Sequence, residues 1–233
     1  MYPENTMRAF ENAVKLDGLA GIELDIQLTK DGQIIVCHDE RADRTTDGIG
    51  EIRQFTLAQL KKLRIDAGDG KYEQIPAMDE VLDLLGDYGD KLRLGLKLNI
   101  ELKNSVFPYE GMEEKIVNLI HRRGIQDSVI YSSFSALSLE RIRELDSKAE
   151  TGILDTKVSD CLYKLKGGCG ADALHPYWRG MDLPKERIKE YPVRAWFTGH
   201  LYPEKPTGTL LNLEMLEQQG ITDVFLNEPE KYV

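Results

Sequence analysis

The hydrophobic pattern of the chain alternates between short strand-like runs and longer stripes with helical spacing. Seven runs rich in branched and aromatic residues predict strands in the parallel role, at 22–28, 98–102, 128–134, 151–154, 171–176, 193–197 and 223–226. Apolar residues at helical spacing predict helices at 5–18, 56–63, 79–85, 112–122, 136–146, 158–166, 184–190 and 210–219. This alternation is typical of a parallel sheet covered by helices, and the number of units favours a closed (β/α)8 barrel. The pattern supplies one parallel strand fewer than the eight of such a barrel.

The stretch GIELDIQLTKDGQIIVCHD predicts a β-hairpin, because Asp-Gly between two apolar runs is a strong turn signal. If the turn centres on Asp31 and Gly32, the numbers of paired residues sum to about 63. That register places Asp25 opposite His38, with Glu23 one same-face step further along. Two carboxylates and an imidazole then gather at one end, where a divalent cation is the usual compensation for buried charge. A solvent-facing edge with scattered charges is the alternative, and spacing does not separate the two.

A third carboxylate comes from the next core strand. Glu101 lies late in its strand, as Glu23 and Asp25 do in theirs, and barrel strands end at one face. Three carboxylates from neighbouring strand ends form a suitable oxygen cage for Mg²⁺ or Ca²⁺. Lys103 follows Glu101 at the strand period and is suited to hold a phosphate oxygen. A salt bridge from Lys103 to one of the carboxylates is equally compatible with the pattern.

Four further side chains are candidates for contact with a substrate or its protons. His38 is a candidate acid or base, because the ordinary pKa of histidine lies near neutrality. His175 ends the run ADALHP and is therefore expected to face the same mouth of the barrel. Phe134 and Trp196 also end strands and are predicted to form an apolar wall for the substrate, with core packing as the alternative.

Composition limits the function classes. The 233 residues suit one barrel-type domain over 1–233, in which the polar, Gly- and Asp-rich segment 40–75 is a small insertion or lid. A net charge of −10 argues against a nucleic-acid partner, but a bound metal still permits a phosphate-containing substrate. Three cysteines without zinc spacing suggest reduced thiols and a cytoplasmic location. The sequence shows no signal peptide and no long apolar run, so we expect no stable insertion into a membrane. Whether the chain forms homo-oligomers stays open.

Several motifs resemble one family when they are taken together. Y-PENT-xx-AF, G-IELDIQLTKDG, V-x-HD, R-TTDGIGEI, IELK, SSF and the final G-ITDVFLNEP follow one another along nearly the whole chain. In this order and near this spacing they resemble the glycerophosphodiester phosphodiesterase family. The resemblance implies a TIM barrel that cleaves glycerophosphodiesters to sn-glycerol 3-phosphate and an alcohol with the help of a divalent cation.

The resemblance also implies roles for individual residues. Positions matching Glu23, Asp25 and Glu101 ligate the metal in that family. The position matching His38 is one of two catalytic histidines, and the position matching Lys103 contacts phosphate. The implied reaction is attack of the glycerol 2-hydroxyl on phosphorus, with proton transfers by the histidines and opening of a cyclic phosphate intermediate. The segment after the hairpin matches a small insertion that the family carries near its active site.

The sequence departs from the family pattern at both ends. The family begins with a strand that ends in His-Arg-Gly just before PENT, whereas this sequence begins MYPENT. We therefore expect the first barrel strand to be lacking, in agreement with the count of seven. Near the other end, the usual Trp-Thr-Val-Asn appears as WFTG at 196–199, and the usual Thr-Asp-x-Pro as NEP at 227–229.

Three functional hypotheses follow. The favoured one is a glycerophosphodiesterase whose recorded sequence lacks its first strand, because the metal set is intact. The second is a catalytically impaired barrel that binds metal and phosphodiester-like ligands, or one to which a partner supplies the strand. The third is a related phospholipase-type phosphodiesterase that acts on lipid headgroups.

Overall fold

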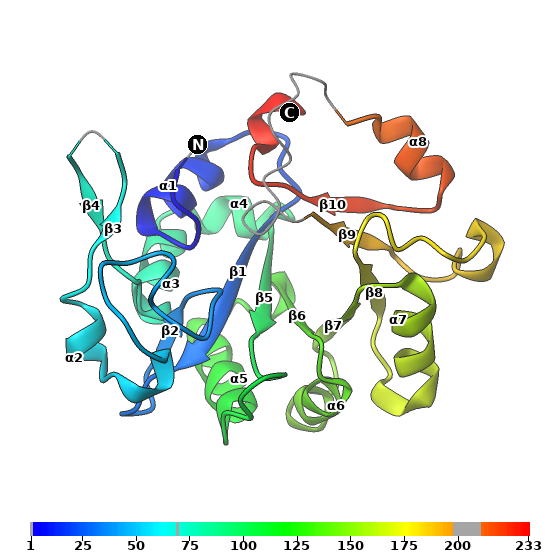
Figure 1. Ribbon diagram of the computed structural model, residues 1–233. Helices are drawn as coiled ribbons and strands as arrows, with labels where there is room; N and C mark the ends of the chain where they lie inside the picture. The colour runs from blue at the N-terminus through cyan, green and yellow to red at the C-terminus, as the bar shows by residue number, and fades with distance from the viewer. Residues whose placement is uncertain (1, 69, 198–210) are drawn as a thin grey trace.

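The computed structural model of the protein describes residues 2–68, 70–197 and 211–233, which form a curved sheet with helices along its outer side (Figure 1). The strands are β1 (Gly21–Leu28), β2 (Ile34–Val36), β3 (Ile65–Asp66), β4 (Tyr72–Glu73), β5 (Lys97–Leu102), β6 (Val129–Ser133), β7 (Glu150–Asp155), β8 (Ala173–Pro176), β9 (Arg194–Trp196) and β10 (Asp223–Phe225). The helices are α1 (Met7–Lys15), α2 (Leu57–Leu60), α3 (Met78–Gly86), α4 (Gly89–Arg93), α5 (Met112–Arg123), α6 (Ala136–Leu145), α7 (Val158–Lys164) and α8 (Leu213–Gln218).

The strands run in the order that an α/β barrel requires. The main sheet has the order β2-β1-β5-β6-β7-β8, and only β2 is antiparallel to its neighbour. Two parallel bridges, Leu174 to Val193 and Tyr177 to Trp196, join β8 to β9, which pairs in parallel with β10. The strands thus follow the colour order of Figure 1 from blue β1 to red β10. The prediction of seven parallel strands is confirmed for the part of the chain that the structure describes.

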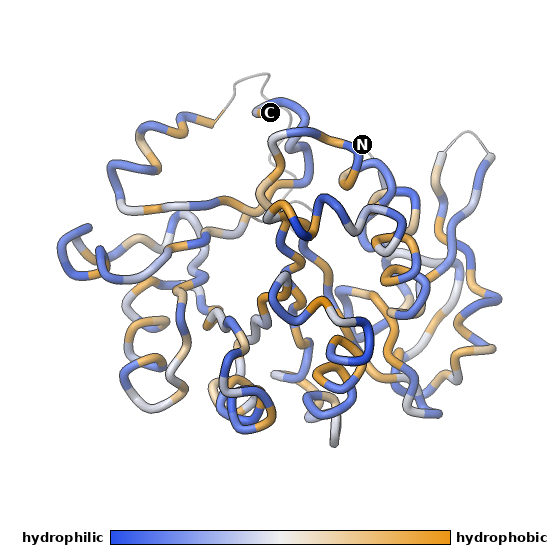
Figure 2. Tube along the Cα trace, turned by 180° about the vertical axis from the view of Figure 1, so that it is seen from behind, coloured by the Kyte–Doolittle hydropathy of each residue, from blue (hydrophilic) through white to orange (hydrophobic). Residues whose placement is uncertain are grey.

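Alternation along the strands separates the core from the barrel interior. In β1, Leu24 and Ile26 are fully buried in the apolar layer that also contains Phe10 of α1 and Ile116 of α5. Period two then directs Glu23 and the other odd-numbered side chains of β1 to the opposite face. Figure 2 shows apolar residues along the central strands and polar residues on the outer loops. Each fully buried Leu, Ile or Phe side chain contributes about 1.5–3 kcal/mol, so this layer fixes the strand positions.

The hairpin register differs by one position from the prediction. Ile26 pairs with Val36, so the paired numbers sum to 62, not 63. The connection has three residues, 30–32, and ends on Gly32 in the left-handed region at φ 72°, whereas the prediction assumed a two-residue turn. As a result, the Cys37 amide donates to the Asp25 carbonyl at 2.9 Å, and the expected pairing of Asp25 with His38 is wrong.

The helix predicted at 184–190 is also wrong, because only a 3₁₀ turn forms there, at Lys185–Arg187. Pro184 and Pro192 bracket the segment, and a residue before proline avoids helical dihedrals, so too few residues remain to nucleate a helix.

Residues 40–75 lie outside the parallel sheet, as expected, but they contain the two-stranded β3-β4 ribbon as well as α2. Helix α4 was not predicted, and residue 210 of the last predicted helix lies outside the described residues.

Thr6 fixes the start of α1. Its buried hydroxyl accepts a hydrogen bond from the Ala9 amide at 3.3 Å and donates to the Pro3 carbonyl at 2.8 Å. Thr6 is therefore the N-cap of α1. Asn5 instead adopts a left-handed conformation, with φ 52°, and its side chain reaches β1.

Replacing Thr6 by alanine is expected to lower the free energy of unfolding by about 1 kcal/mol, because the first turn of α1 loses its cap. Thr6→Ser keeps the hydroxyl and serves as the matched control. Urea denaturation of both variants checks this expectation, and equal stability of the two would contradict the assigned cap.

Candidate active site

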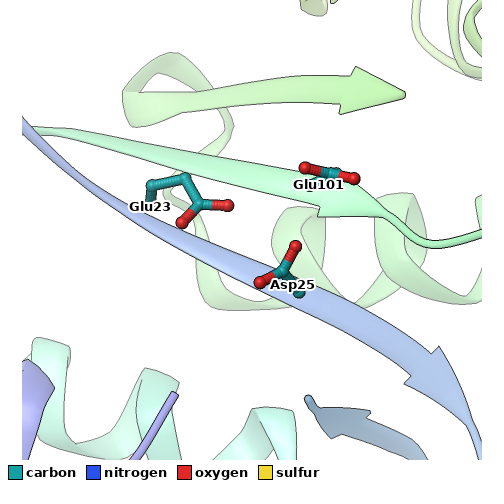
Figure 3. Close-up of side chains that lie close together, drawn as sticks. All are labelled: Glu23, Asp25 and Glu101. Atoms are coloured by element: carbon teal, nitrogen blue, oxygen red, sulfur yellow. The ribbon is translucent and has the colours of Figure 1, made fainter. Parts of the chain in front are cut away.

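Three carboxylates from two neighbouring strands meet in the structure (Figure 3). Glu101 lies late in β5, as expected, but Glu23 is the third residue of β1 and lies in its first half. Asp25 of β1 and Glu101 of β5 are partners in the parallel register, and Glu23 lies one same-face step earlier on β1. One oxygen from each of the three lies within 4.8 Å of the others. Carboxylate oxygens are the ligands that Mg²⁺ and Ca²⁺ prefer, so the chemistry of this donor set fits a hard divalent cation.

The electrostatics of this cluster also fit a cation. The Oδ1 atom of Asp25 is buried and has no hydrogen-bond partner among the described residues. Burial, together with the charges of Asp25 and Glu101, raises the pKa of Glu23 well above its ordinary value of 4.5. Burial likewise raises the pKa of Glu101, against the opposing effect of Lys103. A cation placed among the three would relieve their mutual repulsion and satisfy the unpaired oxygen.

Lys103 lies beside the carboxylates, as its spacing from Glu101 predicts. Its Nζ atom is 2.9 Å from Glu101 Oε1 and 3.8 Å from Asp25 Oδ1, and only 11% of its side chain is exposed. Burial alone would lower the pKa of Lys103, but these two carboxylates raise it above its ordinary value. The salt bridge that was the alternative interpretation is therefore present, and it holds a charged ammonium group at the edge of the carboxylate cluster.

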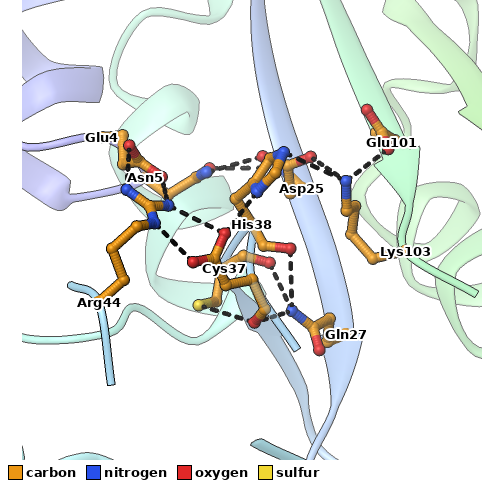
Figure 4. Close-up of polar contacts among 10 residues, drawn as sticks. Glu4, Asn5, Asp25, Gln27, Cys37, His38, Arg44, Glu101 and Lys103 are labelled. Atoms are coloured by element: carbon orange, nitrogen blue, oxygen red, sulfur yellow. Dashed lines mark hydrogen bonds and ion pairs between the residues drawn. The ribbon is translucent and has the colours of Figure 1, made fainter. Parts of the chain in front are cut away.

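His38 lies within a chain of polar contacts, between Lys103 and Asp39 (Figure 4). Its Nε2 atom is 3.3 Å from Lys103 Nζ, and its Nδ1 atom is 2.7 Å from Asp39 Oδ1. Arg44 Nη2 donates to Asp39 Oδ1 at 3.0 Å, and Arg44 Nη1 donates to Glu4 Oε2 at 3.0 Å. Asp39 thus orients the imidazole, and Arg44 holds Asp39 against the segment that precedes α1.

The pKa of His38 reflects these neighbours. Burial lowers it, but the hydrogen bond to Asp39 and the charge of Asp25 more than offset this, so the pKa lies above 6.5. The raised pKa favours the protonated form of the His38 imidazole.

Asn5, Asn99 and Ser132 lie beside these residues, although the sequence analysis did not predict them as site residues. Asn5 Nδ2 donates to Asp25 Oδ2 at 2.8 Å, and Asn5 Oδ1 accepts from the Asp25 amide at 3.3 Å. Asn99 Nδ2 donates to Ser132 Oγ at 2.9 Å. The strand period places Asn99 on the same face as Glu101, and this signal was available. No spacing rule links Asn5 to a strand twenty positions later, and only the fold brings them together.

All the predicted site residues line one cavity of about 960 Å³, which also reaches Asn5, Asn99 and Ser132. The predicted residues are Glu23, Asp25, His38, Glu101, Lys103, Phe134, His175 and Trp196. The rings of Phe134 and Trp196 pack edge to face with centroids 6.1 Å apart, and Trp196 Nε1 donates to the His175 carbonyl at 3.1 Å. The expected aromatic wall is thus in place, and its contact with a substrate stays a prediction.

His175 is the most enclosed of these side chains. It is fully buried, and neither of its ring nitrogens has a hydrogen-bond partner in the described parts of the chain. Its ring lies directly over Gly152, where any Cβ atom would collide with it. Burial, assisted by the charge of Arg194, lowers the pKa of His175 to about 3. His175 is therefore neutral at pH 7 and is suited to hydrogen bonding, not to proton donation as an imidazolium.

Comparison with known proteins places the chain in a family. The sequence model described as the glycerophosphoryl diester phosphodiesterase family matches residues 1–165. The chain belongs to this family. A glycerophosphodiester phosphodiesterase of Bacillus altitudinis is 36% identical over 241 residues, which cover 100% of this chain and 92% of the relative. The uncharacterized protein YqiK of Bacillus subtilis is 42% identical over 241 residues, covering 99% of this chain and 91% of that protein.

Solved structures of family members share the fold. A phosphodiesterase of Oleispira antarctica, in complex with the product sn-glycerol-3-phosphate, has a TM-score of 0.76 and 28% identity, covering 99% of this chain and 90% of that one. The glycerophosphodiester phosphodiesterase of Thermotoga maritima has a TM-score of 0.69 and 24% identity, covering 99% and 91%. The predicted family and barrel fold are thus confirmed. No helix within 2–68, 70–197 or 211–233 is long and apolar enough to cross a membrane.

The low pKa of His175 predicts a dependence of stability on pH. The pKa is about 3 in the folded chain and 6.5 in its ordinary state, so the unfolded chain binds more protons between these values. His175 therefore destabilises the fold progressively as the pH falls below 6.5, by about 2 kcal/mol at pH 5.

His175→Gln keeps a polar side chain but cannot take up the proton. The stability of the wild type relative to this variant should fall between pH 7 and pH 5 in urea denaturation. A difference that does not change with pH would show that His175 is not buried in its neutral form.

Proposed function

We propose that the protein hydrolyses glycerophosphodiesters to sn-glycerol 3-phosphate and an alcohol with the help of a divalent cation. The observation that carries this proposal is the meeting of Glu23, Asp25 and Glu101 beside Lys103 and His38 in one cavity. The product bound to the Oleispira antarctica relative and the names of the curated relatives support it.

Glu23, Asp25 and Glu101 are the residues that would hold Mg²⁺ or Ca²⁺. A cation at this position supplies a Lewis acid that neutralises charge on the phosphodiester oxygens. The buried Asp25 Oδ1 supports the assignment, because it accepts no hydrogen bond from the described residues and a buried carboxylate oxygen without one is costly. Asn5 binds the other carboxylate oxygen of Asp25 and thereby fixes the direction in which Oδ1 points.

The remaining side chains supply orientation and proton transfer. The Lys103 ammonium group is suited to bind a non-bridging phosphate oxygen, in exchange for part of its contact with Glu101. His38 presents Nε2 toward the cluster and is suited to take the proton of the attacking glycerol hydroxyl or to protonate the leaving alcohol. The hydrogen bond from Nδ1 to Asp39 selects the tautomer in which Nε2 is the base.

The far wall of the cavity is assigned to the alcohol part of the substrate. Phe134 and Trp196 offer apolar surface there, and neutral His175 offers hydrogen bonds. The substrate proposed is a small diester and not a nucleic acid, in keeping with the net charge of −10. We also propose a cytoplasmic location, because the three cysteines are buried and free.

Hydrolysis of glycerophosphocholine by the purified chain tests the activity. We expect turnover with Mg²⁺ or Ca²⁺, none after chelation, and loss of turnover in Glu23→Gln. Glu11→Gln on the exposed face of α1 is the matched control. Turnover that survives both chelation and Glu23→Gln would refute the proposal, and release of headgroups from micellar lipid alone would favour the phospholipase-type alternative.

Thermal unfolding tests the cation site without reference to activity. A cation that binds the folded chain at a hundred times its dissociation constant stabilises it by about 2.7 kcal/mol. We expect a rise of the melting temperature with Mg²⁺ or Ca²⁺ in the wild type and in Glu11→Gln. Glu23→Gln should lose that response, and an equal response in all three proteins would place the cation elsewhere.

His38→Gln should lower kcat by about 10²–10⁴-fold, because it removes one general acid or base. Asp39→Asn should also lower kcat and leave KM nearly unchanged, because the imidazole loses its tautomer and orientation. The control is Asp87→Asn, an exposed change at the end of α3. Full activity of His38→Gln would remove His38 from the mechanism.

A further inference from the structure

Gln27 lies on the inner face of β1, one same-face step beyond Asp25. The strand period of two places its side chain in one row with those of Glu23 and Asp25. Gln27 is fully buried, and a buried amide group is costly unless its polar atoms are hydrogen-bonded. Its hydrogen-bond partners therefore identify what this amide holds in place.

The Nε2 atom of Gln27 donates to the backbone that carries His38 (Figure 4). It lies 2.9 Å from the carbonyl oxygen of Cys37, 3.3 Å from that of His38 and 2.7 Å from that of Asp39. Three successive carbonyl oxygens converge on one nitrogen only where the backbone bends, and β2 ends at Val36, just before this segment. Gln27 thus closes a bend at His38.

This bend sets the contact between His38 and Asp39. In an extended strand, the side chains of neighbouring residues point to opposite faces. Here the Nδ1 atom of His38 lies 2.7 Å from Oδ1 of Asp39, the next residue, so the two side chains turn toward each other. The hydrogen bond that orients the imidazole therefore depends on the backbone conformation that Gln27 holds.

The other end of the Gln27 amide is held by Tyr109. The Tyr109 hydroxyl group donates to Gln27 Oε1 at 2.8 Å from the segment between β5 and α5. Burial, together with the charge of Glu40, raises the pKa of the Tyr109 hydroxyl above its ordinary value of 10, so the hydroxyl keeps its proton near neutrality. Because this hydroxyl donates and the three carbonyls accept, only one orientation of the amide satisfies all its partners.

The segment after β5 thus reaches His38 in two ways. Lys103, just after the strand, lies 3.3 Å from the Nε2 atom of the imidazole. Tyr109, farther along the same segment, acts on the backbone of His38 through Gln27. Neither Gln27 nor Tyr109 is among the described residues that line the cavity of the carboxylate cluster. Their effect on a substrate therefore passes through His38.

We propose that Gln27 and Tyr109 are positioning residues for the reaction, and that through one hydrogen-bonded amide they hold the bend at His38 and with it the tautomer and direction of the imidazole. This inference rests on the proposed function, because that function assigns a proton transfer to His38. A displacement of about 1 Å in an active site can lower a rate by about 10²-fold, so loss of the bend should act on kcat more than on KM.

Kinetics of glycerophosphocholine hydrolysis test this proposal. Gln27→Leu keeps the approximate size of the side chain and removes its hydrogen bonds, and it should lower kcat by about 10–10²-fold with little change in KM. Tyr109→Phe should lower kcat by about fivefold, the effect of one hydrogen bond. The two substitutions together should be no worse than Gln27→Leu alone, because both act through one amide. Gln74→Leu is the matched control, since this exposed glutamine also donates to a backbone carbonyl, that of Lys61, and kcat should not change.

The tautomer of His38 provides a measurement that does not depend on turnover. Nitrogen NMR spectra of chelated protein labelled at the histidine nitrogens show whether the neutral ring carries its proton on Nδ1 or on Nε2, and His38→Gln identifies the signals of His38. The wild type and Gln74→Leu should carry the proton on Nδ1, where Asp39 accepts it. Gln27→Leu should show a mixture of both forms, and Tyr109→Phe a smaller change in the same direction.

Leu162→Ala separates positioning from a general loss of stability. Leu162 of α7 belongs to an apolar cluster separate from the layer behind β1, so its loss should destabilise the fold and leave kcat and the tautomer of His38 unchanged. Near-UV circular dichroism checks that each variant is folded. Should Gln27→Leu not fold, the milder Tyr109→Phe decides by the same two measurements.

The outcomes distinguish this proposal from the proposed function. Turnover that is lost in His38→Gln but unchanged in Gln27→Leu, with an unchanged tautomer, would overturn the positioning role and leave the proposed function standing. An equal fall of kcat in Leu162→Ala would also overturn it. A wild type without turnover would contradict the proposed function, and the tautomer would then still show whether Gln27 holds the bend.

Discussion

The parallel pairing of β1 with β5 is the interaction on which the rest of the site depends. Its register sets Asp25 beside Glu101 and leaves Glu23 one step away on the same face. A shift by a single residue would exchange the faces of β1 and turn the carboxylates into the apolar layer that contains Leu24 and Ile26. The burial of that layer therefore holds three carboxyl groups close together, although their mutual repulsion when ionised opposes this arrangement.

The cost of holding these charges is distributed over neighbouring groups. Lys103 supplies one positive charge from the position just after β5, and Asn5 donates to Asp25 from the segment before α1. The Oδ1 atom of Asp25 still accepts no hydrogen bond from the described residues and lies 3.8 Å from the Lys103 ammonium group. A divalent cation completes the arrangement in the proposed function. The proposed metal site and the proposed proton-transfer group are also linked, because Lys103 contacts both the carboxylates and His38.

Sequence patterns predicted the parallel strands and the grouping of the three carboxylates because both follow from short repeats. Side chains alternate between the two faces with a period of two along a strand, and strand and helix alternate from one unit of the barrel to the next. They failed where the chain makes contacts that no period encodes. The hairpin register was off by one because a three-residue loop replaced a two-residue turn at Gly32. Asn5 was not predicted as a site residue, because its reach to Asp25 depends on how α1 packs against β1. The Arg44 link to Glu4 likewise joins segments forty positions apart.

The central claim is that Glu23, Asp25 and Glu101 bind one divalent cation together. A crystal structure of the protein grown with Ca²⁺ tests it most directly. The account predicts one strong density peak in contact with all three carboxylates, at about 2.3–2.6 Å from their oxygens. Saturating Ca²⁺ with no peak between them, and with Lys103 still paired to Glu101 as a complete salt bridge, would contradict it.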